Sequence, residues 1–438
     1  MTSVRNQSAP VGPLVTLEKP VYGGACLARV EGKAVFVPLT LPGEQARIRI
    51  AQSRMAFAEG EAAEIVQPSP QRVAAACPHF GVCGGCAYQH AAYPAQLAMK
   101  QAILRETLER AGVHPPAEIG MLSGEPWGYR NRIRLAFDAQ GNPGYRGRRS
   151  HAVTPIAECP IAAPHLAEAA LAFARIARVA APALKPTELA LFANAEGSQL
   201  LLTVIAASAR KHRFEALAEA LSREIPALIG AELAVEDRGS AFPRTVARSG
   251  AASLTYRAAG FDYRVDHGAF FQVNRGLVDG LVEKVVQGQT GKLAWDLFAG
   301  VGLFARQLTS RFDRVVAVES APSSTQALAA NLKGTRGIPV RSATLEFLRA
   351  NLPQAKPDRA VPDLIVVDPP RIGLGAESCE LLLRIGAPTL VSVSCDPATL
   401  ARDLKWLTAG GYTLQSVTLA DLFPQTFHLE SIAILKKS

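Results

Sequence analysis

From about residue 290 onward, the chain alternates short apolar runs with stretches of helical spacing. The apolar runs are Ala294–Phe298, Arg314–Val318, Leu364–Val367 and Thr389–Val393. Strands that alternate with helices predict a mostly parallel, doubly wound α/β sheet of the Rossmann-like kind. Ligands of such a sheet bind beyond the carboxyl ends of its strands, so the residues that follow these runs are the first candidates for a functional site.

The first run leads into the motif D-x-F-x-G-x-G, from Asp296 to Gly302. Gly300 and Gly302 let the backbone pass close to a ligand and turn into a helix. Glu319, at the end of the next run, suits hydrogen bonds to both hydroxyls of a ribose. Ala305 stands where a dinucleotide-binding fingerprint has its third glycine, so the motif is more characteristic of S-adenosylmethionine binding. The alternative is an ordinary turn followed by a solvated glutamate.

The third run ends in Asp368-Pro369-Pro370-Arg371. Two consecutive prolines fix φ and extend the chain, which would hold Asp368 rigidly over the ligand crevice. A D-P-P motif at this place resembles the signature of methylases that act on planar nitrogen or base substrates. The alternative is a rigid turn with no role in binding.

Cys395 follows the fourth run. Carbon 5 of uracil is a poor nucleophile, but a thiolate that adds to carbon 6 turns the ring into an enolate that can attack a methyl sulfonium. A base must then remove the carbon 5 proton so that the thiol can leave. Cys395, Asp368 and Glu430 can supply the thiolate, a carboxylate near the base and the proton acceptor. The alternatives are a small buried thiol for Cys395 and a solvated carboxylate for Glu430.

A second group of cysteines predicts a metal site. Cys77, Cys83 and Cys86 have the spacing C-x5-C-x2-C, and Cys159 offers a fourth thiol. Four cysteines fit either a [4Fe–4S] cluster or zinc. Zinc ribbons usually pair two C-x2-C arms and this chain has one, which favours iron–sulfur. The alternative is a set of buried free thiols.

The rest of the chain divides into an N-terminal β module and a mixed central part. Residues 14–66 are β-rich, and Ala46–Ile50 alternates as a strand does. Further along, we expect a helix over Ala95–Ala111, a buried strand over Leu200–Ala207 and a helix over His212–Glu224.

Charge and hydropathy bear on partners and location. The 438 residues carry a net charge of +9, which favours a polyanionic partner such as RNA or DNA, although solubility alone is the alternative. The apolar runs fall far short of the roughly 20 residues of a membrane helix. The first ten residues contain no apolar leader, so we expect a cytoplasmic protein without a membrane partner.

Together these motifs resemble one family, the RNA 5-methyluridine methyltransferases, and within it the iron–sulfur 23S rRNA branch called RlmD. The likeness covers nearly the whole chain. It is carried by the motifs above and by Cys83–Gln89, Gly128–Arg132, Gly144–Arg146, Phe270–Asn274, Ser394–Asp403 and Asp421–Thr426. It implies a TRAM-like, OB-like RNA-binding barrel over 1–67, a central α+β iron–sulfur domain over 68–255 and a methyltransferase domain over 256–438. We expect the helix over 95–112 to pack on the catalytic domain.

The resemblance also implies roles for single residues, and a monomer that flips a uridine out of structured RNA. Cys395 would be the nucleophile and Glu430 the proton-abstracting base. The residues implied in contacts to S-adenosylmethionine or the target base are Gln272, Phe298, Gly300, Glu319, Thr344 and Asp368, and those implied as [4Fe–4S] ligands are Cys77, Cys83, Cys86 and Cys159. The substrate implied is 23S rRNA, with tRNA as the alternative.

The sequence departs from the family at three places. Asp396 replaces the asparagine that often follows the nucleophile, and its charge would raise the pKa of Cys395 unless it is turned away. Leu303 replaces a polar cofactor contact. In the stretch 342–346 the helpful Asn or Asp is missing, and Thr344 would substitute for it.

Three other classes of protein remain to be weighed. A DNA cytosine-5 methyltransferase shares the thiolate chemistry, but its nucleophile commonly follows a proline, whereas Ser394 precedes Cys395. A non-catalytic RNA-binding or ribosome-assembly protein has no need of Cys395, Glu430 and Asp368 together. An iron–sulfur redox protein would leave the S-adenosylmethionine motifs without a use.

Overall fold

The computed structural model describes residues 12–181, 184–208, 210–236, 243–352 and 360–438. The N-terminal residues, on which the expected location rests, lie outside these ranges. The chain forms two compact units, one of Met1–Ile103 with Pro424–His428, the other of Leu104–Phe423 with Leu429–Ser438. Among the described helices, none has the length and apolar character to cross a membrane.

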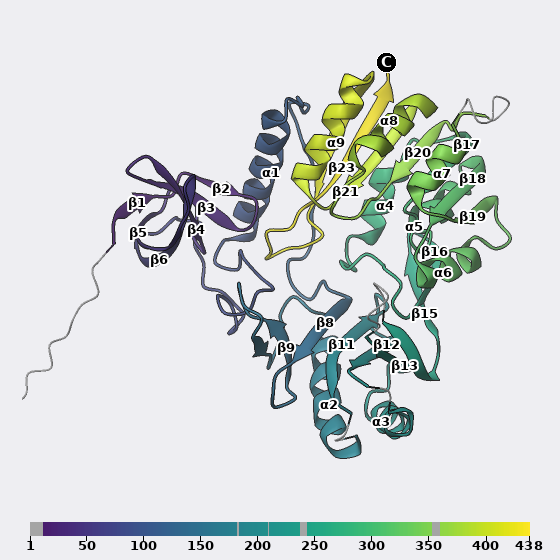
Figure 1. Ribbon diagram of the computed structural model, residues 1–438, viewed down its shortest axis with the longest axis horizontal. Helices are drawn as coiled ribbons and strands as arrows, with labels where there is room; N and C mark the ends of the chain where they lie inside the picture. Colours follow the sequence, from purple (N-terminus) through teal and green to yellow (C-terminus); the bar gives the residue numbers. More distant parts are fainter. Residues whose placement is uncertain (1–11, 182–183, 209, 237–242, 353–359) are drawn as a thin grey trace, which may run out of the picture. The chain divides into compact units, whose positions relative to one another are not determined.

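The first unit is built on a six-stranded sheet in the order β1-β5-β6-β4-β3-β2 (Figure 1). Because β1 and β2 are consecutive in the chain but stand at opposite ends of this order, the sheet closes into a small barrel. The Glu18 backbone N–H, just before β2, donates to the Leu27 carbonyl (2.7 Å) and extends the pairing of β2 with β3. The strands are β1 (Leu14–Thr16), β2 (Lys19–Val21), β3 (Ala25–Val30), β4 (Lys33–Pro38), β5 (Gln45–Ser53) and β6 (Phe57–Gln67).

The barrel forms because its strands alternate buried and solvent-facing residues. The first half of β5 alternates in this way, with Ala46 and Ile48 fully buried between partly exposed neighbours, as the sequence predicts. Val35 and Val37 of β4 meet them in one apolar core. An ion pair joins the segment after the barrel to the barrel itself: the Arg72 guanidinium donates to the Glu44 carboxylate (2.5 and 2.7 Å).

Helix α1 (Tyr93–Arg110) follows a cysteine-rich loop and agrees with the helix predicted over Ala95–Ala111. At its start, Gln96 is fully buried and exchanges hydrogen bonds with Gln425 (2.9 and 3.0 Å). The Gln425 carbonyl also accepts the backbone N–H groups of Ala87 and Tyr88, both at 2.9 Å. A short segment near the C-terminus therefore completes the first unit.

The second unit contains a seven-stranded sheet in the order β10-β9-β8-β11-β12-β13-β14. Helices α2 (Pro164–Ala180) and α3 (Lys211–Glu224) share one apolar core with its strands (Figure 1). The strand and the helix predicted at 200–207 and 212–224 are confirmed. The strands are β8 (Arg132–Phe137), β9 (Pro143–Arg146), β10 (Val153–Pro155), β11 (Pro186–Ala193), β12 (Leu200–Ala206), β13 (Leu228–Val235) and β14 (Arg244–Gly250).

An eight-stranded sheet in the order β19-β18-β17-β20-β21-β23-β22-β7 dominates the rest of this unit. The five strands from β19 to β21 run parallel, whereas β23 is antiparallel to β21. Its strands are β7 (Gly120–Leu122), β17 (Gly291–Leu297), β18 (Phe312–Glu319), β19 (Gly337–Arg341), β20 (Leu364–Val367), β21 (Thr389–Ser394), β22 (Tyr412–Ala420) and β23 (Glu430–Lys437), and its helices are α4 (Val278–Val286), α5 (Leu303–Leu308), α6 (Pro322–Leu332), α7 (Thr344–Ala350), α8 (Gly375–Ile385) and α9 (Pro397–Ala409). This confirms the doubly wound, Rossmann-like fold and its four predicted strands.

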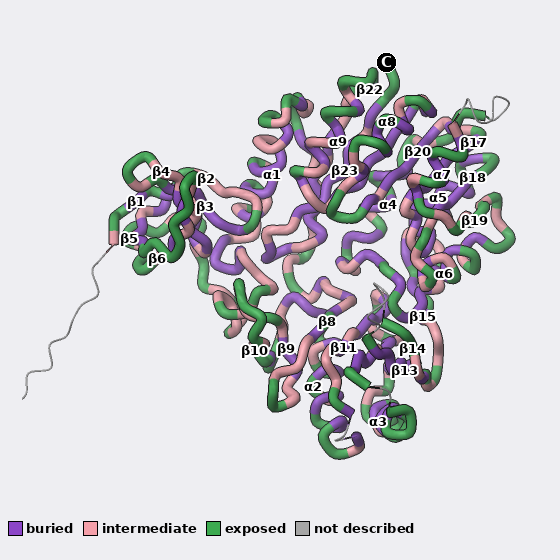
Figure 2. The backbone as a smooth tube through the Cα atoms, in the orientation of Figure 1, coloured by how far each residue is buried: buried purple, intermediate pink, exposed green. Residues whose placement is uncertain are grey.

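The central strands of this sheet are buried throughout. Every residue of β20 and of β21 is buried, and Figure 2 shows this interior beneath more exposed helices. A parallel strand covered on both faces requires a continuous apolar run, which is the pattern that the sequence displays. The ends of these strands are therefore fixed firmly, and the loops that follow them form the candidate site.

Candidate active site

Each of the five parallel strands is followed by a residue that the sequence predicts for the site. Gly300 lies beyond β17, Thr344 beyond β19, Asp368 beyond β20 and Cys395 beyond β21, and Glu319 is the last residue of β18. The chain order reverses between β17 and β20, because β18 and β19 extend the sheet to one side and β21 to the other. At such a switch point the loops separate and leave a crevice for a ligand.

The predicted nucleophile and the predicted base lie at the ends of two neighbouring strands. Cys395 directly follows β21, and Glu430 is the first residue of β23. Ser394 and Ser431 are partners in the antiparallel register, and the Ser431 hydroxyl donates to the Ser394 carbonyl (3.2 Å). The pairing brings the next residues of the two strands, Cys395 and Glu430, to the same edge.

Burial and neighbouring charges shift the pKa values of the ionisable groups at this edge. The pKa of Cys395 is raised to about 11, mainly by burial and also by the carboxylates of Glu430 and Asp368, while Arg371 lowers it. Burial also raises the pKa of Asp368 to about 7. The pKa of Glu430 is raised by burial and by Asp368, and lowered by Arg371. In the protein alone the thiol is protonated at neutral pH, with two carboxyl groups near it that can hold a proton.

The burial of the Glu430 carboxyl group is typical of a group that contacts a ligand. Its side chain is 5% exposed, and its Oε1 atom is buried without a hydrogen-bond partner among the described residues. Buried polar atoms are almost always hydrogen-bonded, so an atom without a partner calls for an explanation. A substrate that brings a polar or acidic group to this edge would provide the missing partner.

Asp396, which the sequence suggests could disturb the nucleophile, is turned away from it. Its side chain caps helix α9, because Oδ1 accepts the backbone N–H groups of Ala398 and Thr399, both at 3.0 Å. Aspartate and asparagine are about equally good at this position of a helix. The charge of Asp396 is accordingly absent from the causes that raise the pKa of Cys395. This departure from the family pattern preserves the local structure.

The loop after β17 is strained in the manner of a binding loop. Phe298 is a non-glycine residue at φ 62°, and Gly300 and Gly302 lie at φ 56° and 90°. A Cβ placed on Gly300 would meet nothing within 4 Å, so this part of the loop borders open space. Residues held in sparsely populated backbone regions cluster at ligand sites, which agrees with the predicted role of Phe298 and Gly300.

Asp296 and Glu319 hold this loop in place. One oxygen of Asp296 accepts the Ala305 backbone N–H (2.8 Å), and the other is buried without a partner among the described residues. Burial, together with the charges of Asp368 and Glu319, raises the pKa of Asp296 to about 8. Glu319 accepts the backbone N–H groups of Gly300 (2.8 Å) and of Ser320 and Ala321 (2.6 and 2.7 Å). Its carboxylate therefore shapes the loops around the crevice as well as facing it.

Gln272 lies outside the eight-stranded sheet, between β16 (Phe261–Asp266) and α4. It is 6% exposed, and its backbone carbonyl accepts the side-chain amide of Asn131 (2.9 Å), which also donates to the Tyr256 hydroxyl (3.0 Å). Thr344 is buried at the first position of α7. The contacts of both residues to a cofactor stay predictions.

Sequence reasoning assigned no role to Asp296, Asn131 or Arg371. Asp296 and Arg371 stand within motifs that the sequence displays, so their positions beside Gly300 and Asp368 were the available signal. Asn131 stands in the Gly128–Arg132 motif, but its contact with the Gln272 carbonyl joins residues 141 positions apart and is not visible in the sequence.

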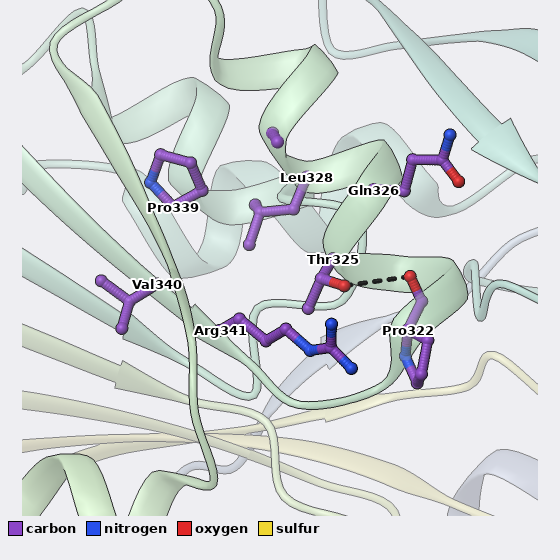
Figure 3. Close-up of a pocket in the computed structure, with 8 residues that line it drawn as sticks. Pro322, Thr325, Gln326, Leu328, Pro339, Val340 and Arg341 are labelled. Atoms are coloured by element: carbon purple, nitrogen blue, oxygen red, sulfur yellow. Dashed lines mark hydrogen bonds between the residues drawn. The ribbon is translucent and has the colours of Figure 1, made fainter.

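A hollow of about 420 Å³ lies at the sheet edge between α6 and β19 (Figure 3). Pro322 of α6 and Arg341 of β19 both line it, and the Thr325 hydroxyl donates to the Pro322 carbonyl (2.9 Å). The residues that line it include none of those predicted for catalysis or cofactor binding. The hollow is therefore a feature separate from the Cys395 edge.

The predicted metal ligands are not gathered into a site by the part of the chain that the structure describes. Within those residues there is no group of three or more His, Cys, Asp or Glu side chains that could hold a metal ion. Cys77, Cys83 and Cys86 lie in one irregular loop of the first unit, where the Cys83 sulfur accepts the Gly85 backbone N–H (3.4 Å), and Cys159 belongs to the second unit. None of the seven cysteines forms a disulfide. The four-cysteine cluster is not confirmed and stays a prediction.

Two family models match the chain. The model of the tRNA (uracil-5-)-methyltransferases matches residues 251–438, which include the whole Cys395 edge. The TRAM domain model matches residues 14–63, which form the barrel. The predicted N-terminal TRAM domain is confirmed.

Similar proteins cover nearly the whole length. An RNA methyltransferase of Streptomyces avermitilis is 36% identical over 95% of this chain and 96% of its own. A protein of Azoarcus sp. named 23S rRNA (uracil(1939)-C(5))-methyltransferase RlmD is 34% identical over 97% of this chain and all of its own. The solved structure of the tRNA (uracil-54, C5)-methyltransferase of Pyrococcus abyssi, in complex with S-adenosyl-L-homocysteine, has the same fold, with a TM-score of 0.74 at 22% identity over 96% of this chain and all of that one. The chain belongs to the RNA 5-methyluridine methyltransferase family, in its RlmD-like branch, and is an RNA (uracil-C5)-methyltransferase.

Proposed function

We propose that the protein uses S-adenosylmethionine to methylate carbon 5 of a uridine in 23S rRNA, through a covalent bond between Cys395 and carbon 6 of the base. The observation that carries this proposal is the edge where Cys395 and Glu430 lie on facing strands beside Asp368. A thiol and two carboxyl groups with raised pKa values are the groups that this reaction requires.

The residues beyond β17 and β18 fit S-adenosylmethionine. The unpartnered oxygen of Asp296 can accept a hydrogen bond from the ammonium group of S-adenosylmethionine, and the open space at Gly300 lets a ligand approach the backbone. Glu319, at the end of β18, would face the ribose. When bound there, S-adenosylmethionine supplies an electrophilic methyl group.

The residues of the Cys395 edge would then handle two protons. The thiol passes its proton to a neighbouring carboxylate, for which Asp368 is suited because its pKa of about 7 lies near neutral pH. The thiolate adds to carbon 6, which makes carbon 5 nucleophilic. After carbon 5 is methylated, Glu430 removes its proton, the double bond re-forms and the thiolate leaves.

The choice of 23S rRNA rests on relatives named for that substrate, which match 97% of this chain. A tRNA substrate is the alternative. A DNA substrate is disfavoured because Ser394 stands where DNA cytosine methyltransferases commonly have proline. A non-catalytic role is disfavoured because it would give no reason to bury Glu430 beside Cys395.

The test is release of tritium from RNA labelled at uracil carbon 5. Protein-free 23S rRNA and bulk tRNA are compared, each with and without S-adenosylmethionine. Release from 23S rRNA that needs the cofactor and is lost in Cys395→Ala supports the proposal. Release from tRNA alone would keep the chemistry and overturn the substrate, and release by Cys395→Ala would overturn the nucleophile.

An iron–sulfur cluster belongs to the same proposal, as a structural element without a redox step. Cys77, Cys83 and Cys86 would supply three thiolates from one loop, and the sequence assigns the fourth to Cys159. Protein purified without oxygen should contain about four iron atoms per chain. Cys83→Ser should lose most of this iron, whereas Cys379→Ser, which changes a buried cysteine of α8, should keep it. Equal iron in both variants would contradict the cluster.

A further inference from the structure

Helix α9 binds the loop that follows Asp368. This loop, from Arg371 to Gly375, connects the D-P-P-R motif to helix α8. Asp403 of α9 is 3% exposed, and its carboxylate accepts the backbone N–H groups of Leu374 (2.7 Å) and Gly375 (3.4 Å). The loop is therefore attached to α9 through its backbone, whatever side chains it displays.

Arg402 completes the attachment. Its guanidinium donates to the Ile372 carbonyl (2.8 Å) and to the carboxylate of Asp403 (2.8 and 3.0 Å). Gly373 lies at φ 75°, and a Cβ placed there would stand 2.5 Å from the Asp403 carboxylate and 2.7 Å from the Arg402 guanidinium. The loop thus packs against both side chains with no room between them.

The proposed nucleophile lies just before the same helix. Cys395 precedes α9 by two residues, and Asp396 caps the helix. One rigid element, about 10 Å long from its cap to Asp403, connects Cys395 to the loop that bears Arg371. Arg371 is the cation whose charge acts on both Cys395 and Glu430, against the charge of Asp368.

We propose that Asp403 is a positioning residue: with Arg402 it fixes the Arg371–Gly375 loop to α9, and so sets where the positive charge of Arg371 stands relative to Cys395 and Glu430. This inference rests on the proposed role of Cys395 as nucleophile. A carboxylate placed only for stability would leave the field at Cys395 unchanged when replaced, whereas a positioning residue would change it.

The experiment compares two alkylating reagents of similar size on the full-length protein. Iodoacetate is negative and iodoacetamide is neutral. The iodoacetate rate divided by the iodoacetamide rate at Cys395, read from its peptide by mass spectrometry, therefore reports the local charge rather than the access or thiolate fraction of the thiol. Arg371→Ala should lower this ratio by roughly threefold, because a positive charge nearby is lost. Asp403→Asn should lower it in the same direction, because the loop that bears Arg371 is no longer held in place. Asp403→Asn in the Arg371→Ala background should lower it no further, because both act through one charge.

Asp363→Asn is the matched control. Asp363 also accepts two backbone N–H groups, of Lys292 (2.7 Å) and Leu293 (3.0 Å), but precedes β20, at the end of the strand away from Asp368. Its ratio should equal that of the wild type. In tritium release, Asp403→Asn should lower kcat by about 10- to 100-fold, as loss of a supporting contact does, with KM for RNA little changed.

An unchanged alkylation ratio in Asp403→Asn, or a further fall in the double variant, would overturn the positioning role. Should Asp403→Asn fold poorly, Arg402→Ala removes both the Ile372 contact and the pairing with Asp403, and should lower the ratio in the same direction; no change there would count equally against the role. Failure of the proposed function would appear differently, as tritium release by Cys395→Ala.

Discussion

Glu430 is a buried carboxyl group with one oxygen that has no partner among the described residues. If it removes the carbon 5 proton, Glu430→Gln should form the bond to carbon 6 and accept the methyl group but fail to eliminate. We expect a covalent RNA–protein adduct, seen as a slower band on a denaturing gel, and tritium release about 10²- to 10⁴-fold slower. Cys395→Ala combined with Glu430→Gln should give no such band. Normal turnover by Glu430→Gln would assign proton removal to another group.

Asp296 should make the ligand-free protein less stable as pH rises. Its pKa is raised to about 8 by burial, whereas the unfolded chain has an ordinary value near 4. Between these values the unfolded chain has lost the proton that the folded protein keeps, so unfolding becomes more favourable with each increase in pH. Asn cannot ionise and can still accept from Ala305. Asp296→Asn should therefore unfold at higher denaturant concentration than the wild type at pH 9, and the difference should shrink at pH 5. A constant difference across this range would contradict the argument.

The sequence could predict which residues lie at the ends of the parallel strands better than the residues that support them. Cys395, Asp368 and Glu319 end apolar runs, and a parallel sheet brings such ends together whatever the details of packing. The direction of a side chain depends on local backbone angles, so the charge of Asp396 could only be flagged, and the structure turns it into a helix cap. Asn131 and Asp403 act through contacts with distant segments, and a single sequence carries no sign of such contacts.

At the scale of elements, α9 depends on the cap that Asp396 provides. Asp396→Ala removes two hydrogen bonds to the first turn and should lower the free energy of unfolding by about 1 kcal/mol. Asp396→Asn should keep both the stability and the rate of tritium release, because asparagine caps equally well and the aspartate charge does not act on Cys395. Denaturant unfolding and the tritium assay measure the two effects. A large rate change in Asp396→Asn would show that the charge itself matters.

The elements that the sequence missed are those without a periodic pattern of their own. The four strands predicted from apolar runs are confirmed, and helix α1 lies within two residues of its predicted ends. Strand β7 has only three residues, and it becomes a strand because β22, some 300 positions later in the chain, offers it a free edge. Strand β23 is antiparallel in a parallel sheet, and it is this reversal that brings Glu430 to Cys395. Neither pairing can be read from local composition.

At the scale of the whole molecule, the excess of positive charge should determine how RNA binds. The chain has 47 Lys and Arg against 38 Asp and Glu, and many of its arginines are engaged by carboxylates, as Arg49 is by Glu61 in the barrel (2.6 Å). Binding of RNA phosphates releases condensed counterions, so affinity should fall linearly on a logarithmic scale of salt concentration. We expect KM for 23S rRNA to rise about tenfold or more between roughly 50 and 200 mM salt. KM for S-adenosylmethionine, which contributes no phosphate, should change little over the same range. The affinity of Cys395→Ala for RNA should depend on salt concentration with the same slope as KM does, because the thiol takes no part in the electrostatic step. An affinity for RNA that is insensitive to salt would instead assign recognition to base contacts and stacking, and would leave the net charge as a device for solubility.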